Sequence, residues 1–161
     1  MKSVPESGLA LIDAFRDAGV PMALYAAVDT PARAMEFAEK VGFPVVVKGE
    51  VPGITHKTEL GLVHTGVGDE QELMGAVDDM RARVSELGGG QVVVQEMVAG
   101  GAELLLSARR VTGVGVLLTV GIGGRLVEVL SMIAVRLCPV EPADIIDMFD
   151  ETPIGTRVKV R

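Results

Sequence analysis

Two neighbouring parts of the sequence combine residue types that can bind or transfer phosphate. Lys48 ends the apolar run 45–47, directly before a glycine-rich segment, so its ammonium group could contact phosphate oxygens. The segment 52–61 contains His56 and Lys57 between glycines, which allow backbone N–H groups to approach a phosphate closely. His56 could act there as a general acid or base, or as a nucleophile that accepts a phosphoryl group.

Two later stretches could contribute to a nucleotide site. The apolar run that begins at residue 91 ends in the polar pair Gln95-Glu96, and a Gly-Gly turn then leads to Glu103. A nucleotide base could lie against such a strand edge and pair with backbone groups. Further along, glycines precede a carboxylate, a combination that suits a phosphate and its Mg²⁺. The residues that these two patterns add are Gln95, Glu96, Met97, Val98, Glu103, Gly121, Gly123 and Gly124 for the nucleotide, and Glu128 for the metal.

Each pattern also has an ordinary structural explanation. A lysine at a strand end can pack its alkyl stem on apolar surface while its ammonium group stays in water. A histidine in a glycine-rich turn can simply be solvated, and a Gly-Gly turn can join two strands of an ordinary hairpin. Glycine-rich turns are common, so taken one at a time these patterns do not identify a function.

Hydrophobic periodicity and capping residues predict the elements that must hold these residues. Helices are expected over 9–19, over 31–41 with Thr30 as N-cap, over 70–87 with Asp69 as N-cap, and over 143–149. Strands are expected over 22–27, 44–48, 60–67, 91–97, 102–109, 114–120 and 126–130, separated by turns that contain glycine. The alternation of helices and strands in the first half, followed by a run of strands, predicts an α+β fold.

Composition excludes several classes of protein. The 161 residues carry a formal net charge of −7, which is unfavourable for a general nucleic-acid binder. A single cysteine, Cys138, excludes a disulfide framework, and the lack of Trp disfavours a base-stacking platform. No apolar run approaches the ~20 residues that span a bilayer. We therefore expect a cytoplasmic protein with neither nucleic acid nor membrane as a partner.

Taken together, the order of these segments resembles the ATP-grasp domain of ADP-forming acyl-CoA synthetases. The resemblance extends from about residue 6 to residue 151, and the segment with the His56-Lys57 pair is its most specific part. The segments that carry it are Gly42–Lys48, Ile54–Gly61, Val94–Val98, Gly101–Leu104, Gly121–Gly124, Val127–Leu130 and Arg136–Pro139.

The resemblance implies a fold and a set of roles. It implies an ATP-grasp fold with two α/β lobes, 1–98 and 99–161, the second incomplete at its C-terminus. Lys48 would contact phosphate, His56 would carry a phosphoryl group beside Lys57, and Glu128 would face the metal. The hinge 95–98 would bind adenine, while Glu103 would face the ribose or metal. ATP or ADP with Mg²⁺ would be the ligands.

The implied activity is that of a ligase, as part of a larger enzyme. It forms acyl-CoA, ADP and phosphate from an acid, CoA and ATP through phosphohistidine transfer, and it needs a CoA-binding domain or subunit as partner. The sequence departs from the family at Leu62, where a second glycine is usual, and at Gly53 and Met132, where acids are usual. These departures favour an alternative, a non-catalytic module that binds nucleotide or a protein partner, such as a regulatory domain of a protein acetyltransferase.

Overall fold

The computed structural model describes residues 8–54, 56–98, 100–101, 103–123 and 133–152. The chain divides into two compact units, Met1–Ala99 and Gly100–Arg161, which are described in turn. Both units combine an antiparallel sheet with helices, as expected for the predicted α+β class. Within the described residues, no helix is both long enough and apolar enough to cross a bilayer.

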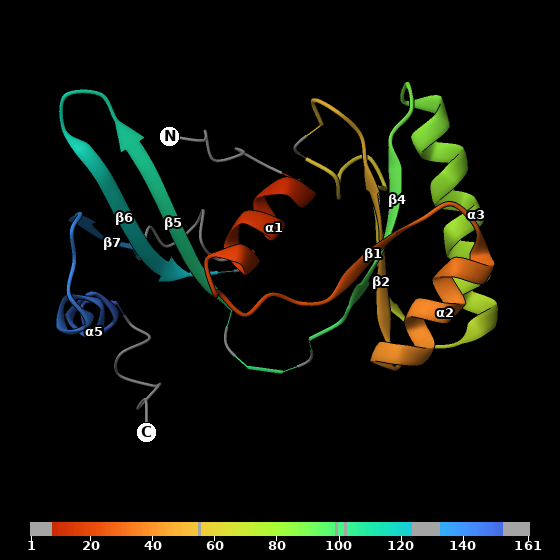
Figure 1. Ribbon diagram of the computed structural model, residues 1–161, viewed down its shortest axis with the longest axis horizontal. Helices are drawn as coiled ribbons and strands as arrows, with labels where there is room; N and C mark the ends of the chain where they lie inside the picture. The colour runs from red at the N-terminus through yellow and green to blue at the C-terminus, as the bar shows by residue number, and fades with distance from the viewer. Residues whose placement is uncertain (1–7, 55, 99, 102, 124–132, 153–161) are drawn as a thin grey trace. The chain divides into compact units, whose positions relative to one another are not determined.

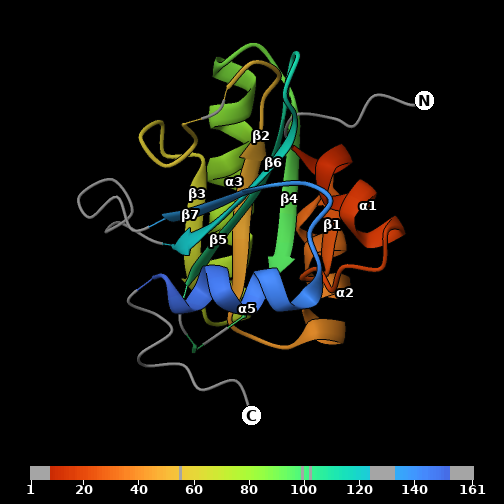
Figure 2. The same cartoon turned by 90° about the vertical axis from the view of Figure 1, so that its left-hand side faces the viewer.

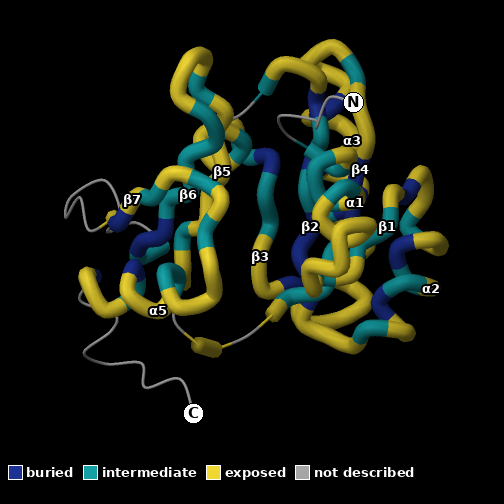
Figure 3. Tube along the Cα trace, turned by 60° about the vertical axis from the view of Figure 1, so that its left-hand side comes forward, coloured by how far each residue is buried: buried dark blue, intermediate teal, exposed yellow. Residues whose placement is uncertain are grey.

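The first unit is a four-stranded sheet with two helices packed on one face (Figure 1). The strands have the order β1-β4-β2-β3, and each neighbouring pair is antiparallel. Val45, Val47 and Leu73 are fully buried between the sheet and the helices, and Figure 3 shows the buried stretch along β2. The elements of this unit are α1 (Leu9–Asp17), β1 (Tyr25–Val28), α2 (Pro31–Val41), β2 (Val45–Glu50), β3 (Val63–Val67), α3 (Glu70–Glu86) and β4 (Gln91–Glu96).

The predicted helix caps are confirmed. The Thr30 hydroxyl accepts a hydrogen bond from the backbone N–H of Arg33, and Pro31 occupies the first turn of α2. The Asp69 carboxylate accepts a hydrogen bond of 2.9 Å from the N–H of Glu72 at the start of α3. In both helices a polar side chain satisfies a backbone donor that has no partner within the helix.

In its described residues, the second unit is a three-stranded antiparallel sheet with one helix (Figure 2). The strands β5 (Leu104–Val111), β6 (Gly115–Ile122) and β7 (Ile133–Leu137) lie in that order, and α5 (Pro142–Asp150) contacts β6 and β7. Val120, Ala134 and Met148 form its small core. Strand β7 was not predicted from the sequence, although the short apolar run at 133–135 could have indicated it. The strand predicted over 126–130 lies outside the described residues.

One prediction was wrong about where β3 begins. The strand starts at Val63 rather than Leu60, because residues 57–62 form a closed turn. The N–H of Gly61 donates to the carbonyl of Thr58 at 3.1 Å, and the N–H of Leu62 donates to that of Lys57 at 2.8 Å. The Leu62 side chain is fully buried, so the turn ends by inserting an apolar residue into the core.

The close approach of β2 to its neighbours gives the first testable prediction. A Cβ built on Gly49 would lie 2.6 Å from Cδ2 of Leu62 and 2.9 Å from Cγ2 of Val84, so Gly49→Ala overpacks the core. We expect it to lower the free energy of unfolding by about 1–3 kcal/mol. Gly75→Ala is the control: it lies within α3, a Cβ there meets nothing within 4 Å, and we expect a gain of up to about 1 kcal/mol.

Urea unfolding followed by circular dichroism measures both variants. If Gly49→Ala were as stable as the wild-type chain, the core around β2 would have room for a methyl group at position 49, and the close packing described here would be contradicted.

Candidate functional site

The face of β2 opposite the helices carries two charged residues. Side chains alternate along a strand, and Val45, Val47 and Gly49 are buried toward α3. Lys48 and Glu50 therefore lie on the other face. Lys48 Nζ donates a hydrogen bond of 2.5 Å to Oε1 of Gln95 on the adjacent strand β4.

A second lysine joins this face from the loop that follows β2. Lys57 forms an ion pair with Glu50, and both side chains are largely shielded, with 23% and 18% of their surface exposed. Lys48 and Lys57 were predicted from the sequence as site residues, whereas Glu50 was not. Its spacing of two residues from Lys48 in a strand was the signal that could have found it.

The surroundings of Lys48 disfavour its positive charge. Burial is the main cause that lowers the pKa of Lys48 from its usual value, and the nearby charge of Lys57 lowers it further. The carboxylate of Glu50 acts in the opposite direction but does not outweigh them. An anion placed beside Lys48 would supply the compensation that the protein's own groups do not provide.

A cavity of about 580 Å³ opens beside the Lys57–Glu50 pair. Its lining includes Gly53 and Ile54 of the loop together with Gly90 and Gln91, which lie at the start of β4. Lys48 and His56 are not among its lining residues, and the His56 side chain is exposed. The structure thus brings Lys57 to the cavity and leaves His56 on the surface of the same loop.

The predicted hinge residues, 95–98 at the end of β4, differ from one another in their contacts and exposure. The backbone N–H of Glu96 donates to the carbonyl of Leu24 at 2.8 Å, and its carboxylate accepts from the N–H of Leu24 at 3.0 Å. Met97 is half-buried, whereas 73% of Val98 is exposed. Glu96 is therefore occupied in fixing the chain before β1, and contact of this segment with adenine stays a prediction.

The second unit brings together two of its predicted residues. Gly123 N–H donates a hydrogen bond of 2.6 Å to the carbonyl of Glu103, and a Cβ on Gly123 would lie 2.9 Å from that carbonyl carbon. Gly121 lies in β6 opposite Leu105. Glycine at 123 is thus needed for the approach of the two segments.

The predicted metal ligand Glu128 and the predicted nucleotide contact Gly124 lie outside the described residues. Among those that are described, no three or more His, Cys, Asp or Glu side chains gather as a metal ion would require.

The lowered pKa of Lys48 predicts a pH dependence of stability. The folded chain binds the lysine proton less tightly than the unfolded chain, so the charged lysine opposes folding below its folded-state pKa. This penalty disappears as the pH rises from that value toward 10.5, the unperturbed pKa. The free energy of unfolding of Lys48→Met, minus that of the wild type, should therefore fall as the pH rises through this window.

Urea unfolding from neutral to alkaline pH measures this difference. Lys40→Met, at an exposed position near the end of α2, is the control and should not show the decline. A difference for Lys48→Met that stays constant with pH would contradict the assignment of a penalised charge.

Comparison with known proteins places this arrangement in a family. The ATP-grasp domain family matches residues 9–160. The ADP-forming acetate–CoA ligase I of Archaeoglobus fulgidus is 30% identical over 151 residues, which cover 92% of this chain and 22% of that protein. The beta subunit of ADP-forming acetate–CoA ligase I of Pyrococcus furiosus is 26% identical over 139 residues, covering 83% of this chain and 59% of that subunit.

Solved structures agree with these sequence matches. Acetyl-coenzyme A synthetase 1 of Ca. Korarchaeum cryptofilum, in complex with coenzyme A, Ca-AMPCP and HgCl⁺, has a TM-score of 0.79 at 26% identity, covering 90% of this chain and 66% of that one. A second structure of that enzyme, with coenzyme A and Mg-AMPPCP and its phosphohistidine segment pointing towards the nucleotide binding site, has a TM-score of 0.73 at 25% identity and covers 91% and 63%.

This chain therefore spans less than two thirds of each of these relatives. The predicted fold and the resemblance drawn from the sequence are both confirmed. The chain belongs to the ATP-grasp domain family and is homologous to ADP-forming acetyl-CoA synthetases.

Proposed function

We propose that this chain is the nucleotide-binding part of an ADP-forming acyl-CoA synthetase. Such an enzyme converts a carboxylic acid, CoA and ATP into acyl-CoA, ADP and phosphate. The family match over residues 9–160 supports this, as do relatives named as acetate–CoA ligases. Because the chain corresponds to only part of those relatives, the proposal includes a CoA-binding domain or subunit as partner.

Lys48, half-buried and hydrogen-bonded to the neutral amide of Gln95, is the observation that carries the proposal. A phosphate group of ATP beside Lys48 would stabilise an ammonium ion that burial otherwise disfavours. Lys57 would supply a second positive charge next to the cavity, where Gly53 permits close approach of the backbone. In this proposal the two lysines orient the phosphates, and the hinge 95–98 contacts the base.

His56 is the proposed acceptor of the phosphoryl group. An imidazole nitrogen attacks the γ-phosphorus of ATP, the new N–P bond forms as the bond to the ADP oxygen breaks, and the ring N–H proton passes to water. Its exposure leaves it accessible to both the nucleotide and a partner. Catalysis of this kind depends mainly on positioning and on neutralising charge.

Magnesium has less support from the chain's own residues. Within the described part of the chain, no cluster of carboxylates provides a metal site, and the predicted ligand Glu128 lies outside it. We therefore assign no catalytic step to a protein-held metal ion. Mg²⁺ would be bound chiefly through the nucleotide phosphates, as is common for this ion.

A second candidate is a non-catalytic module that binds nucleotide or a protein partner. Leu62 stands where the acyl-CoA synthetases usually have a second glycine, and its side chain is fully buried against Gly49. The position thus serves the core in this chain. Binding of nucleotide without phosphoryl transfer would identify this second function.

Loss of Lys48 should weaken nucleotide binding. Lys48→Ala removes one charge-assisted contact with phosphate, which should cost about 1.5–3 kcal/mol, or roughly a 10- to 150-fold loss of affinity. Isothermal titration with ATP and ADP, each with and without Mg²⁺, measures this change. Lys40→Ala, at an exposed position on α2, is the charge-matched control and should bind as the wild type does. Unchanged affinity in folded Lys48→Ala would contradict the role of this lysine.

Phosphorylation should occur at His56 and not at His64. We expect ATP, Mg²⁺ and a CoA-binding subunit of this enzyme class to give an acid-labile label that mass spectrometry at neutral pH locates on His56. His56→Ala should lose the label and keep nearly full nucleotide affinity. His64 is the internal control, since its Nε2 lies 3.1 Å from the Asp79 carboxylate.

Label on His64, or label that persists in His56→Ala, would rule out the proposed acceptor. Nucleotide binding without any label, in the presence of a competent partner, would instead support the non-catalytic function.

A further inference from the structure

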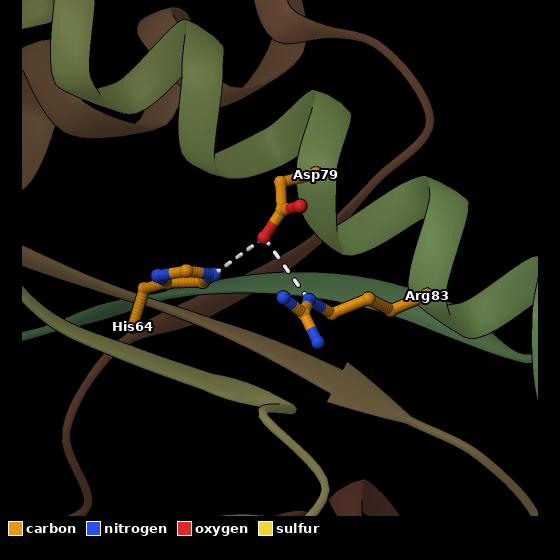
Figure 4. A network of polar contacts seen from close by, with 3 residues as sticks. All are labelled: His64, Asp79 and Arg83. Carbon is orange, nitrogen blue, oxygen red and sulfur yellow. Dashed lines mark hydrogen bonds and ion pairs between the residues drawn. The ribbon is translucent and has the colours of Figure 1, made fainter.

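A group of three polar side chains, His64, Asp79 and Arg83, links α3 to the strand and turn that follow the candidate site. Nε2 of His64 on β3 and Nε of Arg83 on α3 each lie 3.1 Å from the same carboxylate oxygen, Oδ2 of Asp79 (Figure 4). Asp79 and Arg83 are one helical turn apart, whereas His64 comes from the sheet. The carboxylate therefore fixes the arginine and ties the helix to β3.

Arg83 extends from this group to the turn that closes the loop of Lys57. A Cβ built on Gly61, which has a φ of +66°, would lie 2.8 Å from Nη1 of Arg83. The guanidinium thus covers the side of Gly61 where any other residue would place its side chain. Gly61 and Leu62 donate the two backbone hydrogen bonds that close the turn, to Thr58 and Lys57.

The loop that contains Lys57 is consequently held at two points, one on each face of the sheet. On one face, Lys57 pairs with Glu50 of β2. On the other, Arg83 lies against Gly61, and Asp79 holds Arg83. Neither Asp79 nor Arg83 lines the cavity beside Lys57. The turn at 57–62 is the contact that connects Arg83 to the loop of Lys57.

The charge state of Asp79 is suited to this task. The hydrogen bond from Arg83 is the main cause that lowers the pKa of Asp79, and the hydrogen bond with His64 adds to it. The carboxylate is thus ionised throughout the neutral range and can hold the arginine there.

We infer that Asp79 and Arg83 are positioning residues for the loop 51–62, and that they set the place of Lys57 and His56 without touching a ligand. The part of this inference that concerns phosphoryl transfer rests on the proposed function. The part that concerns the order of the loop does not.

The first experiment measures the order of the loop directly in the 161-residue chain. Amide hydrogen exchange, followed by NMR, reports the opening of the Leu62 N–H bond to the carbonyl of Lys57. We expect Asp79→Asn and Arg83→Gln each to speed exchange at Leu62 by roughly two- to fivefold, the range for loss of an exposed ion pair, while exchange at Val94 in β4 is unchanged.

Neighbouring positions on the same helix provide matched controls. Asp78 and Arg81 form an exposed ion pair of 3.7 Å within α3. Asp78→Asn and Arg81→Gln remove the same chemical groups without disturbing Gly61, so exchange at Leu62 should stay at the wild-type rate. Arg83→Lys keeps the charge but lacks the planar guanidinium that covers Gly61, and it should give an intermediate rate.

The second experiment separates positioning from binding. In Asp79→Asn and Arg83→Gln, the rate of His56 labelling should fall about tenfold or more, whereas ATP affinity should change less than about threefold because Lys48 and the hinge are untouched. Exchange at Leu62 equal to that of the two controls would overturn the inference. The variants could exchange faster at Leu62 while the wild-type chain neither binds ATP nor accepts label. That result would support the role of Asp79 and Arg83 in anchoring the loop and would overturn the proposed function instead.

Discussion

The alternation of side chains along β2 is the constraint on which the first unit depends. This strand pairs with both β4 and β3, so it lies inside the sheet. The side chains on each of its two faces must therefore suit what covers that face. The face with Val45, Val47 and Gly49 meets the helices, and the missing side chain at 49 allows Leu62 and Val84 to close over the strand. The opposite face then carries Lys48 and Glu50, next to the buried Val46. A single strand thus determines both the packing of the core and the position of the charges.

Local signals in the sequence were sufficient for most elements. Thr30 and Asp69 each precede an amphipathic run and cap a helix in the structure, because a side-chain oxygen at that position satisfies backbone donors whatever the tertiary context. Strand β2 was equally clear, since a run of valines has strong strand propensity. The family resemblance added the fold, which these local signals alone would have left as a general α+β arrangement.

What the sequence did not predict depends on contacts between segments distant in the chain. The predicted strand 60–67 included Leu60, yet the turn at 57–62 excludes it from β3. Arg83, more than twenty residues later in the chain, packs against that turn. The spacing of Glu50 from Lys48 could have placed it on the same face of β2, but its ion pair with Lys57 depends on the course of the loop, which no local pattern shows. The network of His64, Asp79 and Arg83 is likewise set by the packing of α3 on β3.

The two lysines of the proposed site differ in what they could contribute to binding. Lys57 already has an anionic partner in Glu50, so a phosphate near it would share or replace an existing ion pair and the net gain would be small. Lys48 has the amide oxygen of Gln95 as its direct partner, and burial disfavours its charge. A phosphate there would relieve a penalty instead of exchanging one anion for another. In a chain with a formal net charge of −7, such local compensation matters more than overall attraction. Affinity for the nucleotide should therefore depend chiefly on Lys48, whereas Lys57 would serve orientation, which is the property that the anchored loop controls.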